Sequence, residues 1–161
     1  KPMTLIVETG EIVAGANSYV SVADAQAILT GRGLLTVVTE AALLQAMDML
    51  SGLEYFGYRV SDVQPLPFPR SGVTLSDNRT LPPNTIPQEL INAQAWAAHY
   101  ILAGSDPAAA SVAGVKREKV DVLEVEYATS SKTSVTVSDM PNVKNALKYL
   151  VCSNAGRIDR A

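Results

Sequence analysis

The segment from Gln88 to Ala103 constrains the fold of this chain more than any other. Its sequence, QELINAQAWAAHYILA, repeats apolar residues at helical spacing and follows Pro87, a residue tolerated in the first turn of a helix. Two neighbouring stripes are apolar: Leu90, Ala93, Ala97 and Ile101 in one, and Ile91, Ala95, Ala98 and Leu102 in the other. An apolar arc this wide needs more than one neighbour. We expect the first stripe to face a second helix and the other stripe to face a third element or an adjacent subunit.

Other segments also read as helices. Ser21, followed by an acidic residue three positions later, forms a variant of the capping box, and the helix it begins ends at Gly31. Thr39 caps a second helical pattern that continues to Arg59. A short helix is expected at about 142–152. The sequence therefore predicts a mainly α protein, with a helical body at about 16–104.

A proline-rich segment, VQPLPFPRSGVTL, interrupts this body at Val63–Leu75. Proline lacks the amide proton and clashes with the preceding turn, so the segment is not the interior of a helix, and it is not a central strand. Leu66 and Phe68 are apolar, which a solvated linker does not need. The segment is therefore a rigid loop with apolar contacts to make.

A β-hairpin or extended arm is expected at about 115–137. The small residues at 105–114 form a hinge before it. Leu123, Val125 and Tyr127 then alternate with glutamates as in a half-buried strand. Val120 and Val122 have the opposite phase, so we expect the arm to project from the helical body and to contact neighbours through both faces.

Composition argues against several classes of protein. A chain of 161 residues with net charge −3 fits one domain, 1–161. The single cysteine, Cys152, excludes an intrachain disulfide and any cysteine-built metal site. The only histidine, His99, has no nucleophile or carboxylate at a suggestive spacing. We therefore expect no enzyme, no cofactor and no metal, and the lack of a long apolar stretch predicts no membrane partner.

One basic cluster is a candidate for nucleic-acid binding. Its residues are Lys116, Arg117 and Lys119. Glu118 lies inside the cluster and Asp121 follows it, so its net charge is low, and a solvated strand face is the favoured interpretation.

Four stretches together resemble a known family: ANSYVSVADA at 16–25, QPLPFPRSGV at 64–73, IPQELINA at 86–93 and VKREKVDVLEVEY at 115–127. In this order they are similar to small head–tail connector (adaptor) proteins of tailed bacteriophages, which are often labelled DnaT-like single-stranded-DNA-binding proteins. The resemblance implies a helical subunit of a homo-oligomeric ring, commonly a dodecamer, at the capsid–tail junction of a virion, made in the host cytoplasm. It also implies portal and tail proteins as partners, and packaged DNA that passes through without specific binding.

The resemblance also implies interfaces. The candidates for contact with a neighbouring subunit, the portal or the tail are Leu66, Phe68, Pro69, Arg70, Ile91, Ala95, Ala98, Leu102, Leu123, Val125 and Tyr127. For Phe68, a place in the core of its own domain is the alternative. For the whole protein, the alternative is a single-stranded-DNA-binding replication protein, which needs a positively charged groove with stacking aromatic residues.

Overall fold

The computed structural model describes residues 3–104, 118–120, 123–125 and 140–152. The helices in these ranges are α1 (Val22–Thr30), α2 (Glu40–Ser51), α3 (Gln88–Leu102) and α4 (Pro141–Leu147). The strands are β1 (Tyr58–Arg59), β2 (Arg70–Ser71), β3 (Glu118–Val120) and β4 (Leu123–Val125). They form two antiparallel ribbons, β1 with β2 and β3 with β4. The prediction of a mainly α chain is confirmed.

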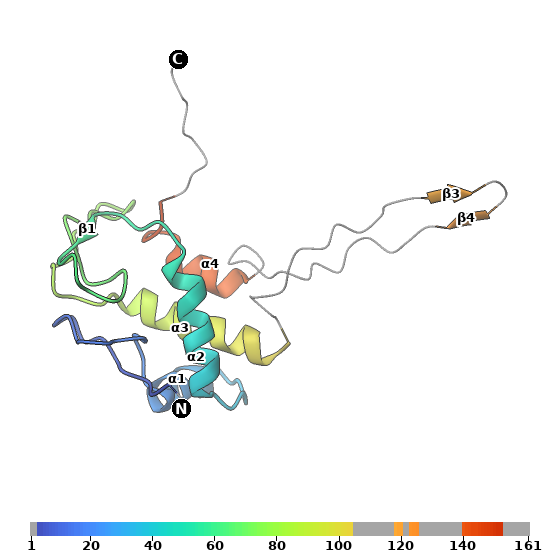
Figure 1. Ribbon diagram of the computed structural model, residues 1–161, viewed down its shortest axis with the longest axis horizontal. Helices are drawn as coiled ribbons and strands as arrows, with labels where there is room; N and C mark the ends of the chain where they lie inside the picture. The colour runs from blue at the N-terminus through green and yellow to red at the C-terminus, as the bar shows by residue number, and fades with distance from the viewer. Residues whose placement is uncertain (1–2, 105–117, 121–122, 126–139, 153–161) are drawn as a thin grey trace, which may run out of the picture.

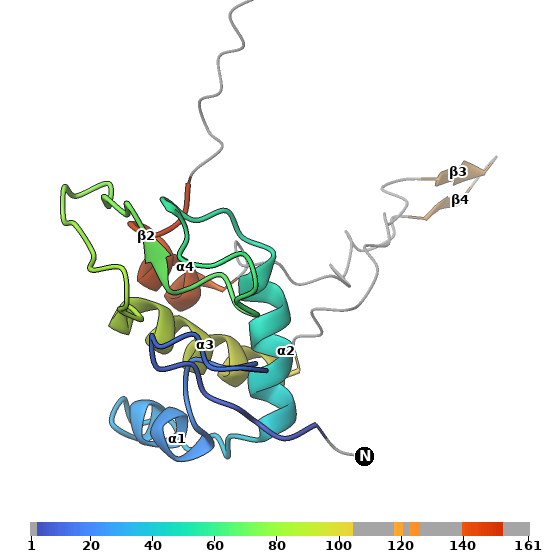
Figure 2. The ribbon, with the colours of Figure 1, turned by 60° about the vertical axis from the view of Figure 1, so that its left-hand side comes forward.

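Helix α3 lies at the centre of the helical body, with α2 crossing it (Figure 1) and with α1 and α4 on either side of it (Figure 2). These three helices of the same chain cover most of its apolar arc, although Leu102 at the end of α3 is 39% exposed. Ala95 and Ala98 are fully buried, so neither lies on a surface that a neighbouring subunit could contact. Ile91 is half-buried and packs against the same core. Ala95 and Ala98 are therefore core residues of their own chain, whereas the assignment of Ile91 and Leu102 to a subunit interface stays a prediction.

The observed starts of the helices agree with the sequence predictions better than the observed ends do. The Ser21 hydroxyl accepts a hydrogen bond from the Asp24 amide at 3.1 Å, and Thr39 accepts one from the Ala42 amide at 3.2 Å. Both predicted caps are confirmed. Helix α2, however, stops at Ser51 rather than continuing to Arg59. Gly52 caps its C-terminus, and the residues that follow pair with other segments of the chain instead of extending the helix.

A buried amide joins the N-terminal segment to the helices. The Gln94 side chain, on α3, accepts a hydrogen bond from the Tyr19 amide at 2.9 Å. It donates to the Ser18 hydroxyl at 2.8 Å and to the Leu43 carbonyl at 3.1 Å. A buried polar group with all these partners costs little and specifies one arrangement. Gln94 therefore fixes the place of the 18–20 segment against α2 and α3.

The proline-rich loop packs into the core of its own chain. Phe68 is 1% exposed, and its ring meets that of Tyr55 edge to face, with centroids 5.2 Å apart. The Phe68 amide donates to the Tyr19 hydroxyl at 2.9 Å, and the peptide bond to Pro69 is cis. Leu66 and Pro69 are also buried. The assignment of these three residues to an intersubunit surface is therefore wrong, and the alternative place of Phe68 in its own core is confirmed.

Arg70 supports the same loop from inside. Its guanidinium donates to the carbonyls of Phe56 at 2.8 Å and Gly57 at 2.6 Å, so it ties β2 to the segment that leads into β1. The backbone at Gly57 has φ 73°, and a Cβ there would lie 2.4 Å from the Ser71 carbonyl oxygen. Glycine is therefore required where these strands approach each other.

The C-terminal third is described only in part. Leu123 and Val125 lie in β4, while Tyr127, the proposed hinge at 105–114 and most of the arm fall outside the described residues. Helix α4 is shorter than the expected 142–152, because the chain turns after Leu147 and Val151 pairs with Tyr55. Among the described residues, no helix has the length and apolar character that crossing a membrane requires.

Candidate functional site

Three ring side chains gather on the outer side of α3. Trp96, His99 and Tyr100 are each half-buried and occupy neighbouring positions on one face of the helix. The ring centroids of Trp96 and His99 are 5.8 Å apart, those of His99 and Tyr100 are 5.7 Å apart, and those of Trp96 and Tyr100 are 6.3 Å apart. We call these three residues the aromatic row.

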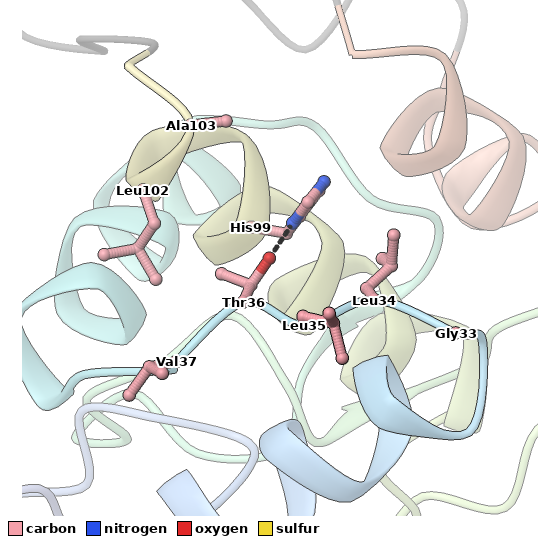
Figure 3. A pocket seen from close by; sticks show the side chains of 8 residues that line it. All are labelled: Gly33, Leu34, Leu35, Thr36, Val37, His99, Leu102 and Ala103. Atoms are coloured by element: carbon pink, nitrogen blue, oxygen red, sulfur yellow. Dashed lines mark hydrogen bonds between the residues drawn. The ribbon is translucent and has the colours of Figure 1, made fainter.

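Polar contacts with other elements orient two of the three rings. The Thr36 hydroxyl is hydrogen-bonded to His99 Nδ1 at 2.5 Å (Figure 3). The Asn142 side-chain amide, on α4, donates to the Tyr100 hydroxyl at 3.2 Å. Because the opposite side of α3 is buried against α2, the helix cannot turn these rings inward. The row is therefore a positioned surface feature.

A guanidinium stands beside the row. Arg32 follows α1 in the sequence GRG, and its guanidinium carbon lies 5.9 Å from the centre of the Trp96 ring. Its Nη1 donates to the Ile28 carbonyl at 2.8 Å, which holds the side chain near the end of α1. A guanidinium at this distance from a tryptophan ring makes a cation–π contact. The GRG turn thus ends a helix, as its sequence indicates, and also places a positive charge against Trp96.

An open depression of about 530 Å³ adjoins the row between the 33–37 segment and the last turn of α3 (Figure 3). Apolar side chains surround it, and three of them are exposed: Leu35 is 94%, Val37 is 76% and Leu102 is 39% exposed. His99 belongs both to the depression and to the aromatic row. The two features therefore form one continuous surface, with flat rings at one end and an apolar rim at the other.

This arrangement is suited to binding planar rings. The rings of the aromatic row are partly exposed, and Arg32 offers a charge that stacks on rings or pairs with an anion. Nucleic-acid bases and phosphates are ligands of this kind. Within the described ranges, no group of three or more histidine, cysteine, aspartate or glutamate side chains is arranged to hold a metal ion.

The basic cluster that the sequence offers as a nucleic-acid candidate is described only in part. Lys116 and Arg117 lie outside the described residues, and Lys119 is the Cα partner of Glu124 in the β3–β4 ribbon, so a positive residue stands opposite a negative one. Sequence reasoning missed the aromatic row. The available signal was the spacing of Trp96, His99 and Tyr100 at i, i+3 and i+4, which places them on one helical face.

The fold and the site define a small, mainly α protein with a cation-flanked aromatic surface. A family model described as "Putative DnaT-like ssDNA binding protein" matches residues 3–161, and the chain belongs to this family. No curated protein and no solved structure matches the chain significantly.

Family membership corrects the resemblance to phage head–tail connectors. The description of the family that matches nearly the whole chain names single-stranded DNA as a ligand and mentions no capsid or tail structure. The predicted role as a ring-forming connector is therefore wrong, and so are the portal and tail partners and the expectation that DNA passes through without specific binding. The location at the capsid–tail junction rested on the same resemblance and stays a prediction.

Proposed function

We propose that this protein binds single-stranded DNA through the aromatic row and Arg32. The observation that carries the proposal is the cluster of three partly exposed rings on one face of α3, with a guanidinium 5.9 Å from the Trp96 ring. The family description supports the same ligand. Unpaired bases expose the π faces that such rings stack against, whereas duplex DNA hides them between neighbouring base pairs.

Stacking is the main source of affinity in this proposal. Base–aromatic stacking contributes about 1–3 kcal/mol per base and tolerates any sequence, since every base has a π face. The chain has net charge −3, so few phosphates are neutralised and few counterions are released. Binding should therefore show little sequence preference and a shallow dependence on salt concentration.

The proposal concerns a binding protein of one domain and includes no catalytic step.

The proposal also includes the arm predicted at about 115–137. The antiparallel pairing of β3 with β4, in which Val120 is the Cα partner of Leu123, supports a hairpin within that range. The proposal includes the projection of this arm from the helical body. Limited proteolysis tests it directly, because a projecting arm should be cut first near the predicted hinge at 105–114.

The chain has one tryptophan, so its fluorescence reports on the proposed site directly. Titration with an oligothymidylate of about 12 nucleotides should quench Trp96 fluorescence, because a stacked base changes the surroundings of the indole. Replacement of Trp96 by leucine should weaken binding roughly tenfold, as measured by anisotropy of a labelled oligonucleotide, through the loss of one stacking contact. Trp96→Phe should retain most of the affinity.

A surface variant controls for nonspecific effects. Val63 is 85% exposed on the proline-rich loop, and Val63→Ala should bind the oligonucleotide like the unsubstituted protein. Circular dichroism of each variant checks that the helices remain. If a folded Trp96→Leu protein binds the oligonucleotide as tightly as the unsubstituted protein, the aromatic row is not the DNA site.

A further inference from the structure

The β1–β2 ribbon places two arginines opposite each other. Arg59 is the Cα partner of Arg70 in the antiparallel register. Like charges directly opposite on a ribbon destabilise it. Among the described residues, neither arginine pairs with a carboxylate, and the ion pairs there join Arg79 to Asp77 and Glu89. The ribbon therefore holds two adjacent positive charges with no negative partner in the described part of the chain.

The two arginines have different freedom. Arg70 is half-buried and its guanidinium is occupied by backbone carbonyls, so it cannot move away from its neighbour. Burial lowers the pKa of Arg70, and the charge of Arg59 lowers it further. Arg59 is exposed, and one of its N–H groups donates to the Gln64 carbonyl at 3.1 Å. Its other N–H groups make no hydrogen bond within the described residues, so they are free to contact a ligand.

An exposed aromatic ring stands next to this pair. Tyr58 precedes Arg59 in β1 and is 67% exposed. Its ring lies over Gly72, where a Cβ would come within 2.8 Å of Tyr58 Cε1. Successive residues of a strand point to opposite faces, so the Tyr58 side chain lies on one face of β1 and the Arg59 side chain on the other. In the described residues that strand pairs only with β2, which leaves its other edge open.

We propose that the Arg59–Arg70 pair binds a phosphate group, with Arg59 making the contact and Arg70 supplying fixed charge behind it. An anion removes the repulsion between the two guanidinium groups, and arginine presents several donors to phosphate oxygens. The phosphate is that of a single-stranded DNA backbone crossing the open edge of β1, because the exposed Tyr58 ring then stacks with a base of the same strand. This choice of source rests on the proposed function.

The surrounding loop is already rigid, which favours binding. Gln64 is buried, and its side-chain amide donates to the carbonyls of Leu66 at 2.8 Å and Pro69 at 2.9 Å. The Gln64 carbonyl, in turn, receives the hydrogen bond from Arg59. A site held in this way loses little conformational entropy when the ligand arrives. The proline-rich segment thus has a structural reason to be stiff.

The test compares Arg59→Gln with a matched control, Arg79→Gln. Arg79 is also an exposed arginine, but its guanidinium is engaged by Asp77 and Glu89. For an oligothymidylate, Arg59→Gln should weaken binding about two- to fivefold at low salt, as expected for one exposed ionic contact. It should also reduce the slope of log K against log salt by about 0.7, the value for one phosphate on a single strand. Arg79→Gln should change neither quantity.

Two further measurements separate the sources of phosphate and the two proposed sites. Inorganic phosphate is added to the protein in a thermal unfolding assay. If it stabilises the unsubstituted protein but not Arg59→Gln, while DNA binding is equal, the site exists and its ligand is free phosphate. If Arg59→Gln matches Arg79→Gln in DNA affinity, salt slope and phosphate response, the inference is wrong. Trp96→Leu, measured in parallel, reports on the aromatic row independently of this result.

Discussion

Replacement of Phe68 by alanine should lower the free energy of unfolding by about 3–5 kcal/mol, as measured by chemical denaturation. The ring is 1% exposed and packs edge to face against Tyr55. Its removal leaves a cavity, because the neighbouring prolines and the Arg70 contacts restrict the loop from collapsing into the space. Burial raises the pKa of the neighbouring Tyr19 and Tyr55 hydroxyls, which indicates that the surroundings of the ring are shielded from water.

The control for this variant comes from the same loop. Val63 is 85% exposed, so Val63→Ala should change the free energy of unfolding by no more than about 0.5 kcal/mol. If Phe68→Ala is as stable as Val63→Ala, then Phe68 does not belong to the core. That result would instead favour a contact of Phe68 with another protein or subunit.

Replacement of Glu8 by alanine should cost at least about 3 kcal/mol of unfolding free energy, because three backbone amides lose their partner. Glu8 is 2% exposed, and its oxygens accept hydrogen bonds from Gly10 at 2.8 Å, Ile12 at 3.0 Å and Val13 at 2.9 Å. These bonds also hold Ile12 at φ 58°, a conformation that β-branched residues rarely adopt. Thermal and denaturant unfolding should both report the loss.

Glu11 provides the comparison, since it is an exposed glutamate in the same loop. Glu11→Ala should unfold like the unsubstituted protein, so any charge effect common to both positions is removed. Glu8→Gln should fall between Glu8→Ala and the unsubstituted protein, because one side-chain oxygen remains as an acceptor. Equal stabilities for Glu8→Ala and Glu11→Ala would show that the 8–13 loop does not depend on this carboxyl group.

Local patterns were sufficient for the starts of α1, α2 and α3, though not for the helix ends. Ser21 and Thr39 cap helices because their hydroxyls accept amide hydrogen bonds within three residues, a rule that needs no tertiary information. The start of α3 after Pro87 follows from the same kind of short-range constraint. The wide apolar arc of α3 likewise indicated several neighbours, although it could not say whether they belong to one chain or two.

Tertiary contacts decided the rest, because they join residues far apart in the sequence. The end of α2 depends on the pairing of Tyr55 with Val151, and the burial of Phe68 depends on Tyr19 and Tyr55. The candidate DNA site depends on Arg32 reaching Trp96 and on Thr36 reaching His99. Local sequence patterns were enough to predict a mainly α chain with defined helix starts. The packing of distant segments decides which apolar residues form the core and which rings stay at the surface beside a charge. Local sequence cannot decide this, since the same residue types serve both roles.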